Sequence, residues 1–318
     1  MHKELKGWIE FLGIEEPILT KLEGGLSSRS YYRIEKLEKK FLVMDAFDEK
    51  ETISRMIGIG LRLKETKIRT PLIRSFELHK GFMLVNDIGS THLFDKCSSA
   101  YYEKAIRTLV EMQTAPTIDL KSHEKGFLLE EMNLMVEWYL KQHLGKTLEC
   151  VEGRQLIEVF SSIIKEVSAQ PQDIFVHRDY HSKNLMIDSE DEIVVIDYQD
   201  AGAGNLTYDL VSLLYDAYVS LDKRERKRLI KLFKMLKGIE VDDETFFRWV
   251  DFTAIQRNLT QLGIFAKLSI ENEKKSYMEH TPLVLQYILD IAEKYPELNA
   301  LVTLLRPEEK DSIGFQFS

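Results

Sequence analysis

Cysteine and long apolar runs are scarce in this 318-residue sequence. Its two cysteines, Cys97 and Cys150, cannot build a disulfide framework and do not have the spacing of metal ligands. No apolar run approaches the roughly 20 residues of a membrane-spanning helix. The first eight residues, MHKELKGW, lack the apolar core of a signal peptide. We therefore expect a cytoplasmic protein that has no membrane partner.

Positive charge is also in short supply. The 43 Lys and Arg residues are outnumbered by 52 Asp and Glu, which gives a net charge of −9. Because nucleic-acid phosphates require a basic protein surface, nucleic acid is excluded as the main partner. A small phosphate-bearing ligand is not excluded, since it needs only a local positive site. The hydrophobic content of 44% is ordinary for a globular protein with a sizeable core.

The polar motif H-R-D-Y-H-S-K-N at residues 177–184 is the most informative stretch of the chain. It matches the H-R-D-x-x-x-x-N catalytic loop of kinases. Asp197 follows a short apolar strand downstream, where kinases keep a second magnesium ligand. Phosphoryl transfer needs an Asp to orient a hydroxyl nucleophile and hard oxygen ligands to hold Mg²⁺. We therefore predict that Asp179 is the catalytic base and that Asn184 and Asp197 bind Mg²⁺.

The surrounding pattern predicts that these residues converge. Residues 173–176, 185–188 and 192–197 read as short apolar strands, and residues 188–191 read as a polar turn. A hairpin of this kind folds the last two acidic and amide side chains back towards the first. The competing interpretation is that the carboxylates only cap turns and helices.

The motifs carry a family resemblance. Residues 177–186, H-R-D-Y-H-S-K-N-L-M, resemble the H-G-D-x-H-x-x-N loop of aminoglycoside phosphotransferases and their small-molecule kinase relatives. Segments 27–33, 42–46, 196–201, 208–214 and 256–266 resemble one branch in particular. That branch holds the bacterial anomeric sugar kinases, which phosphorylate C1 of N-acetylmuramate and N-acetylglucosamine in cell-wall recycling. The resemblance implies an ATP- and Mg²⁺-dependent kinase with a small amino sugar as its substrate.

We expect an α+β, protein-kinase-like fold with two lobes. The N-terminal, nucleotide-binding lobe would span residues 1–88, and the larger helical lobe, with the catalytic loop and the acceptor site, residues 89–318. The helix expected at 48–66 places Ile53, Ile57 and Leu61 on one apolar stripe. Strands are expected at 30–37, 40–46, 74–78 and 81–86, and further helices at 100–113, 128–143, 154–169 and beyond residue 208.

The expected phosphate site departs from the protein-kinase pattern. Loop 24–29, G-G-L-S-S-R, can bring backbone N–H groups near phosphate, and we assign Gly25, Ser27, Ser28 and Arg29 to it. The strand at 40–45 has no lysine in its middle, where protein kinases hold the α- and β-phosphates. Arg29 or Arg33 is expected to supply the missing charge, although Arg29 fits a surface turn equally well.

The link between the lobes is the expected adenine site. Backbone groups near Val85, Asn86 and Asp87 would hydrogen-bond the adenine ring. An ordinary strand end followed by a glycine turn explains the local sequence equally well.

The acceptor pocket is assigned to residues that flank the catalytic ones. Arg178 is predicted to contact the substrate or a carboxylate of the site, and Gln199 and Asp200 to read sugar hydroxyls. His177 and Asp209 are expected to brace the catalytic loop structurally. The helix around residues 256–265 either walls the pocket or belongs to the core.

Several alternatives remain open. An aminoglycoside, choline or homoserine is a possible acceptor, and a nucleotide-binding pseudokinase scaffold is the non-enzyme alternative. A protein kinase is disfavoured because no activation-loop segment follows Asp197. The basic segment 221–228 is interpreted as a solvated helix, capped by Asp222 and buried through Leu229, Leu232, Phe233 and Leu236, in preference to an anion-binding surface.

Overall fold

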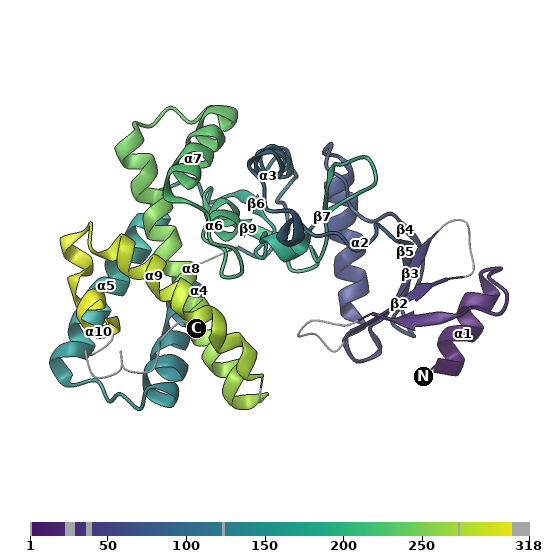
Figure 1. Ribbon diagram of the computed structural model, residues 1–318, viewed down its shortest axis with the longest axis horizontal. Coiled ribbons are helices and arrows are strands. Elements are labelled where there is room, and N and C mark those ends of the chain that lie inside the picture. The colour runs from purple at the N-terminus through teal and green to yellow at the C-terminus, as the bar shows by residue number, and fades with distance from the viewer. Residues whose placement is uncertain (1, 23–28, 36–39, 123–124, 273, 307–318) are drawn as a thin grey trace. The chain divides into compact units, whose positions relative to one another are not determined.

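The computed structural model describes residues 2–22, 29–35, 40–122, 125–272 and 274–306 (Figure 1). Contacts between residues divide the chain into two compact units. The first contains residues 1–118 and 177–201, and the second contains residues 119–176 and 202–318. This division differs from the lobe boundary expected between residues 88 and 89, which stays a prediction.

The first unit contains a five-stranded antiparallel sheet in the order β1-β2-β3-β5-β4. The four expected strands and their hairpin pairings are therefore confirmed; β2, β3 and β5 are shorter than expected, and β4 begins one residue earlier. The register pairs Tyr32 with Val43 and Val43 with Leu84, so these apolar side chains share one face. The strands are β1 (Leu19–Lys21), β2 (Ser30–Ile34), β3 (Phe41–Asp45), β4 (Ile73–Glu77) and β5 (Phe82–Asn86).

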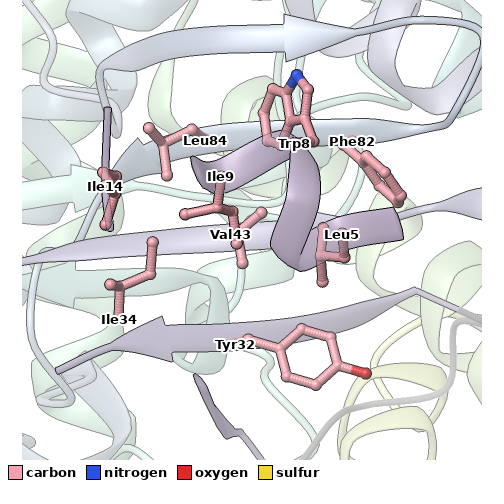
Figure 2. Close-up of a cluster of buried hydrophobic side chains, with 9 residues drawn as sticks. All are labelled: Leu5, Trp8, Ile9, Ile14, Tyr32, Ile34, Val43, Phe82 and Leu84. Atoms are coloured by element: carbon pink, nitrogen blue, oxygen red, sulfur yellow. The ribbon is translucent and has the colours of Figure 1, made fainter. Parts of the chain in front are cut away.

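Helix α1 (His2–Phe11) covers that apolar face of the sheet. Figure 2 shows Leu5, Trp8 and Ile9 of the helix packed among sheet side chains, including Val43 and Phe82. The rings of Trp8 and Phe82 lie 5.7 Å apart. Burying one face of a twisted sheet under an amphipathic helix gives this small layer its own hydrophobic core.

Helix α2 (Glu51–Lys64) forms where a helix was predicted, but its buried stripe differs from the prediction. The buried positions are Ile53, Met56, Ile59 and Leu63, whereas Leu61 is 61% exposed. The predicted stripe advanced by four residues at each step. The observed stripe starts with steps of three, which rotates the buried face around the helix.

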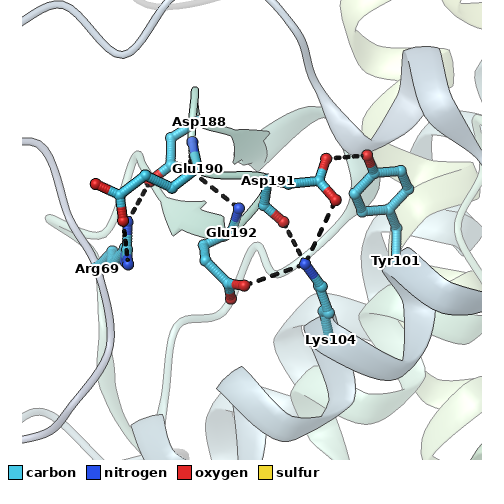
Figure 3. A network of polar contacts seen from close by, with 7 residues as sticks. All are labelled: Arg69, Tyr101, Lys104, Asp188, Glu190, Asp191 and Glu192. Atoms are coloured by element: carbon cyan, nitrogen blue, oxygen red, sulfur yellow. Dashed lines mark hydrogen bonds and ion pairs between the residues drawn. The ribbon is translucent and has the colours of Figure 1, made fainter.

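The rest of the first unit carries the motif at 177–184. It comprises α3 (Ser99–Met112) and a two-stranded hairpin of β7 (Leu185–Ile187) and β8 (Ile193–Val195). The hairpin predicted between the magnesium-ligand candidates is thus confirmed. Two cations hold its turn, as Figure 3 shows: Arg69 bonds Asp188 and Glu190, and Lys104 on α3 bonds the following acidic residues.

The second unit is mostly helical and is organised around α8 (Asp243–Glu271). Residues 252–260 of this helix are all buried, and α4, α5, α6 and α9 contact it. A β-carbon on Gly263 would lie 2.3 Å from the backbone carbon of Leu134, so only glycine permits this close approach. The other helices are α4 (Lys125–Leu134), α5 (Cys150–Ser168), α6 (Tyr208–Leu214), α7 (Lys223–Lys237), α9 (Thr281–Ala292) and α10 (Asn299–Leu305).

Two helix predictions in this unit need correction. The helix expected at 128–143 begins at Lys125 and continues as a π-helical segment over Met135–His143. The helix expected from residue 154 begins at Cys150, because Glu149 and Glu152 form a reciprocal capping box at its start. A short pair, β6 (Ile174–Val176) with β9 (Gly202–Gly204), lies in the same unit. Among the described helices, none has the length and apolarity to span a bilayer.

Candidate active site

His177 ties the start of the catalytic motif to the segment that leads into Asp197. Its Nε2 lies 2.9 Å from the carbonyl oxygen of Ile196, and its Nδ1 accepts a hydrogen bond of 3.2 Å from the backbone N–H of Asp179. Both bonds are satisfied by the neutral tautomer that carries its proton on Nε2. The clamp holds the motif against the residue that precedes Asp197.

Asn184, at the end of the catalytic motif, hydrogen-bonds back to Asp179. Its Nδ2 donates to the backbone oxygen of Asp179 at 3.0 Å and to Oδ2 of the same residue at 3.1 Å. Its backbone oxygen accepts from the N–H of Ile196 at 3.1 Å. The structure therefore brings Asp179 and Asn184 together and ties both to the strand that leads into Asp197.

The carboxylate of Asp179 is held in place yet accessible. His181 Nε2 lies 3.1 Å from its Oδ2, and half of the Asp179 side chain is exposed. A carboxylate that is fixed by hydrogen bonds but open to solvent can accept a hydrogen bond from the hydroxyl group of a bound substrate.

Asp197 lies next to the candidate phosphate-binding arginine. Arg29 Nη2 is 3.2 Å from Oδ1 of Asp197, and Arg29 Nε is 3.8 Å from Glu49. The nearby Tyr31 is not a second base: burial raises its pKa to about 12, the carboxylates of Asp197 and Glu49 add to that rise, and Arg29 opposes it. Of the two arginines considered from sequence, Arg29 is the one at the metal-ligand candidate.

Two site residues have a left-handed backbone that non-glycine residues rarely adopt. The φ angle is 74° at Arg178 and 60° at Asp197. Such strain of about 1–3 kcal/mol persists only where surrounding contacts impose it, and it clusters at functional sites. The position of Arg178 corresponds to the glycine of the H-G-D pattern, which the backbone conformation explains.

Gln199 and Asp200 follow the metal-ligand candidate as a linked pair. Gln199 Nε2 donates to Asp200 Oδ2 at 3.1 Å, and Arg55 on α2 lies 3.4 Å from Asp200 Oδ1. Gln199 is buried, and its Oε1 has no hydrogen-bond partner within the described structure. Asp200 is exposed, so of the two predicted acceptor contacts it is the one open to a substrate.

The predicted nucleotide contacts are only partly described. Gly25, Ser27 and Ser28 lie outside the described residues. Val85 and Asn86 are in β5, and Asp87 follows directly.

The side chain of Asp87 is already engaged. Its carboxylate takes two bonds from Arg33, at 2.6 and 3.2 Å, and that contact raises the pKa of Arg33. Arg33 is thus paired with Asp87 at the end of β5. The backbone N–H groups of Asn86 and Asp87 donate to the carbonyl oxygens of Leu72 and Lys40, so in this structure neither N–H is available to an adenine ring.

Two further sequence candidates lie in the second unit. Asp209 is fully buried in the first turn of α6. Gln256 on α8 is buried and donates to Glu131 at 2.9 Å, and its neighbours Leu259, Leu262 and Phe265 are buried too. The core interpretation of the 256–265 helix fits this burial. The bracing role of Asp209 stays a prediction.

The donor set at Asn184 and Asp197 fits Mg²⁺. Because the Nδ2 of Asn184 is spent on Asp179, its Oδ1 is the atom left to face a cation, and Asp197 offers a one-third exposed carboxylate. Over the described ranges, no three His, Cys, Asp or Glu residues cluster as a self-sufficient metal site. Mg²⁺ commonly binds through one or two carboxylates plus substrate phosphates, so two protein ligands are compatible with it.

Sequence reasoning missed three contributors to this site. His181 stands inside the motif, so its spacing of two residues from Asp179 was an available signal. Glu49 and Arg55 contact Arg29 and Asp200 through the tertiary fold, and no local pattern marks them.

Comparison with known proteins defines the class. The model of the phosphotransferase enzyme family, APH, matches residues 18–242, and the chain belongs to this family. The enzyme class expected from the sequence, a phosphotransferase, is therefore confirmed.

Particular relatives narrow the comparison. The chain is 31% identical to the N-acetylmuramate/N-acetylglucosamine kinase of Pseudomonas putida over 297 residues, which cover 90% of this chain and 87% of the relative. It is 28% identical to the protein of the same name from Neisseria meningitidis serogroup B, with 99% and 98% coverage. The resemblance stated from the sequence motifs is confirmed.

Solved structures confirm the kinase-like fold. ADP-bound aminoglycoside phosphotransferase APH(2'')-Ib superposes with a TM-score of 0.64 at 13% identity, covering 92% of this chain and 99% of that one. Choline kinase LicA from Streptococcus pneumoniae superposes with a TM-score of 0.67 at 14% identity, covering 91% and 99%. At such identities the likeness establishes the fold alone.

Proposed function

We propose that this protein transfers the γ-phosphoryl group of ATP, with Mg²⁺, to the anomeric hydroxyl of an N-acetylated amino sugar. The relatives named N-acetylmuramate/N-acetylglucosamine kinase support this acceptor, because the similarity extends over nearly the full length of the chain. Cell-wall recycling in the cytoplasm, where ATP is available, is the proposed setting.

The observation that carries the proposal is the hydrogen bonding of Asp179. Asn184 and His181 both approach its Oδ2, while half of the side chain stays exposed. In this arrangement Asp179 would accept a hydrogen bond from the sugar hydroxyl and take its proton late in the transfer. An anomeric hydroxyl is more acidic than an ordinary alcohol, so a carboxylate is an adequate base.

The remaining residues would neutralise the phosphate charge and contact the sugar. Asn184 and Asp197 would hold Mg²⁺, which neutralises phosphate charge when it is bound. Arg29, which lies beside Asp197, would bind the phosphates in place of the lysine that β3 lacks. Arg178, Gln199 and Asp200 would contact the sugar.

Measuring turnover with a panel of candidate acceptors distinguishes the amino sugar from the alternatives. Release of ADP from ATP and Mg²⁺ should be measured with N-acetylmuramate, N-acetylglucosamine, kanamycin, choline and homoserine. We expect turnover on the N-acetylated sugars and its loss in Asp179→Asn, which keeps the shape of the side chain. Activity on kanamycin or choline alone would refute the sugar assignment, and ATP binding without turnover would favour the pseudokinase.

A further inference from the structure

A second binding site is indicated by a cavity within the second unit, away from the catalytic motif in sequence. Side chains of α7, α8 and α9, together with Tyr215 at the end of α6 and Lys294 after α9, line a volume of about 290 Å³. The lining combines four cationic side chains, two carboxylates, and apolar or aromatic groups. A cavity of this size suits a small ligand.

The charges of this cavity do not balance. Lys223 lies 2.7 Å from Asp290, and Lys294 lies 3.0 Å from Asp251, so each carboxylate has its own lysine. Arg226 and Lys227 then remain: within the described part of the chain neither forms one of these salt bridges, and Arg226 acts on Asp290 only through longer-range electrostatic attraction. Lys227 instead lies over the ring of Phe247, 5.8 Å from its centre. The cavity therefore carries two positive charges in excess.

Arg226 is held in a conformation suited to a ligand. Its guanidinium packs against the rings of Tyr215 and Tyr287, 4.5 and 4.6 Å from their centres, and these two rings contact each other edge to face. Nη2 donates to the carbonyl of Leu221 at 3.0 Å. Although Arg226 is only 8% exposed, its Nε has no hydrogen-bond partner among the described atoms. Arginine is seldom buried without pairing, and a buried donor that lacks a hydrogen-bond partner destabilises the protein.

The helix that carries these cations differs from its sequence-based description in one respect. Asp222 caps α7 as predicted, accepting from the N–H groups of Arg224 and Glu225. The buried face, however, includes Arg226 and Ile230, whereas Leu232 and Leu236 are half-buried. Three cations of the basic segment, Lys223, Arg226 and Lys227, thus reach the cavity from the first turns of α7, where the helix dipole also favours negative charge.

We propose that this cavity binds a small organic phosphate monoester. Its dianionic phosphate matches the two excess charges, and guanidinium groups bind phosphate oxygens in a bidentate fashion. The rings of Tyr215, Tyr287 and Phe247 supply the surface for the organic part. Binding here needs neither the catalytic loop nor turnover, so the proposal does not depend on the acceptor assigned above.

Calorimetric titration of the full-length protein with phenyl phosphate tests the site. We expect one molecule to bind at this cavity, with affinity at least tenfold lower in Arg226→Met, which keeps the apolar stem of the side chain. Arg224→Met is the matched control, since this exposed residue lies on the same helix, and it should bind as the wild type does. Phenyl phosphate bound equally by wild type and Arg226→Met would refute the site.

Two comparisons keep the test decisive. Inorganic phosphate and phenol should each bind more weakly than phenyl phosphate, and equal binding of either would refute the assignment to a monoester. If Arg226→Met does not fold, Lys227→Met leaves the tyrosine pair intact and should weaken binding several-fold. No binding to the wild type, or unchanged binding in Lys227→Met, overturns the proposal.

Discussion

Arg29 and Asp197 form an ion pair at the candidate active site, with Nη2 3.2 Å from Oδ1. The carboxylate in this pair is the one expected to hold Mg²⁺, and the cation is the one expected to hold phosphate. In this pair Arg29 neutralises the charge of Asp197. When ATP and Mg²⁺ bind, we expect the metal to take over that carboxylate and Arg29 to turn to the phosphates.

Replacing Arg29 by methionine should impair nucleotide use specifically. We expect the KM for ATP to rise at least tenfold and kcat to fall, because phosphate loses its cationic partner. Arg29→Lys should recover part of both values. Initial-rate kinetics at saturating acceptor measure the effect.

Arg107→Met serves as the control, since Arg107 is an exposed residue on α3. It should leave both constants unchanged. An unchanged KM and kcat in Arg29→Met would show that Arg29 is only a structural partner of Asp197.

The strained backbone at Arg178 predicts an order of stabilities. Arg178→Gly and Arg178→Ala both remove the side chain, but only glycine accepts the φ of 74° without strain. Arg178→Gly should therefore be more stable than Arg178→Ala by about 1 kcal/mol in urea unfolding. If Arg178 contacts the acceptor, both variants should raise the KM for the sugar equally. A more stable alanine variant would contradict the strain.

Gly263 should tolerate no β-carbon. In Gly263→Ala the new atom would meet backbone atoms of Leu134 and Met135 at 2.3 and 2.5 Å, which can yield only if α8 moves. We expect a loss of about 2–3 kcal/mol in the free energy of unfolding. Gly153→Ala, within α5 and with open space at its β-carbon, should instead stabilise by about 0.5–1 kcal/mol. Equal effects of the two changes would refute the close approach.

Acid should weaken the hairpin that joins Asn184 to Asp197. Burial alone would raise the pKa of Asp188, but hydrogen bonds from the Glu192 backbone and Arg69 lower it below its ordinary value of 3.8. A carboxyl whose pKa is lower in the folded state stabilises the protein above the unfolded pKa, and this contribution is lost as pH falls through the folded pKa. Asp188→Asn can retain the backbone hydrogen bonds to Oδ1, but it loses the charge and the hydrogen bond from Arg69, which an amide NH2 cannot accept.

The destabilisation caused by Asp188→Asn should thus be full at pH 6 and shrink below about pH 4. Urea unfolding across this pH range measures it. Asp173→Asn, an exposed residue, is the control and should show no such trend. A difference that stays constant with pH would contradict the account.

The sequence predicted the local geometry of the candidate site better than it predicted how the helices and strands pack. The 177–184 motif and the apolar runs around it were sufficient to predict the hairpin, because spacing along the chain fixes which residues meet there. The clamp by His177 on Ile196 also joins residues that flank this hairpin. Contacts between residues that flank one short hairpin can be predicted from a single sequence.

Contacts between elements that are distant in the chain could not be predicted from the sequence. Leu61 was expected to be buried, yet which face of α2 turns inward depends on neighbours that the sequence does not specify. The same holds for Glu49 beside Arg29 and for Arg226 against two tyrosine rings. These relationships arise from packing between elements distant in the chain, for which periodicity gives no register.

The product of the reaction tests the central claim most directly. The protein should be incubated with ATP, Mg²⁺ and N-acetylglucosamine or N-acetylmuramate, and the product examined by phosphorus–proton correlation NMR. We predict a phosphate monoester whose phosphorus couples to the anomeric proton, formed by the wild type and not by Asp179→Asn. A phosphorus coupled to another sugar proton, or no sugar phosphate from a protein that binds ATP, would contradict the account.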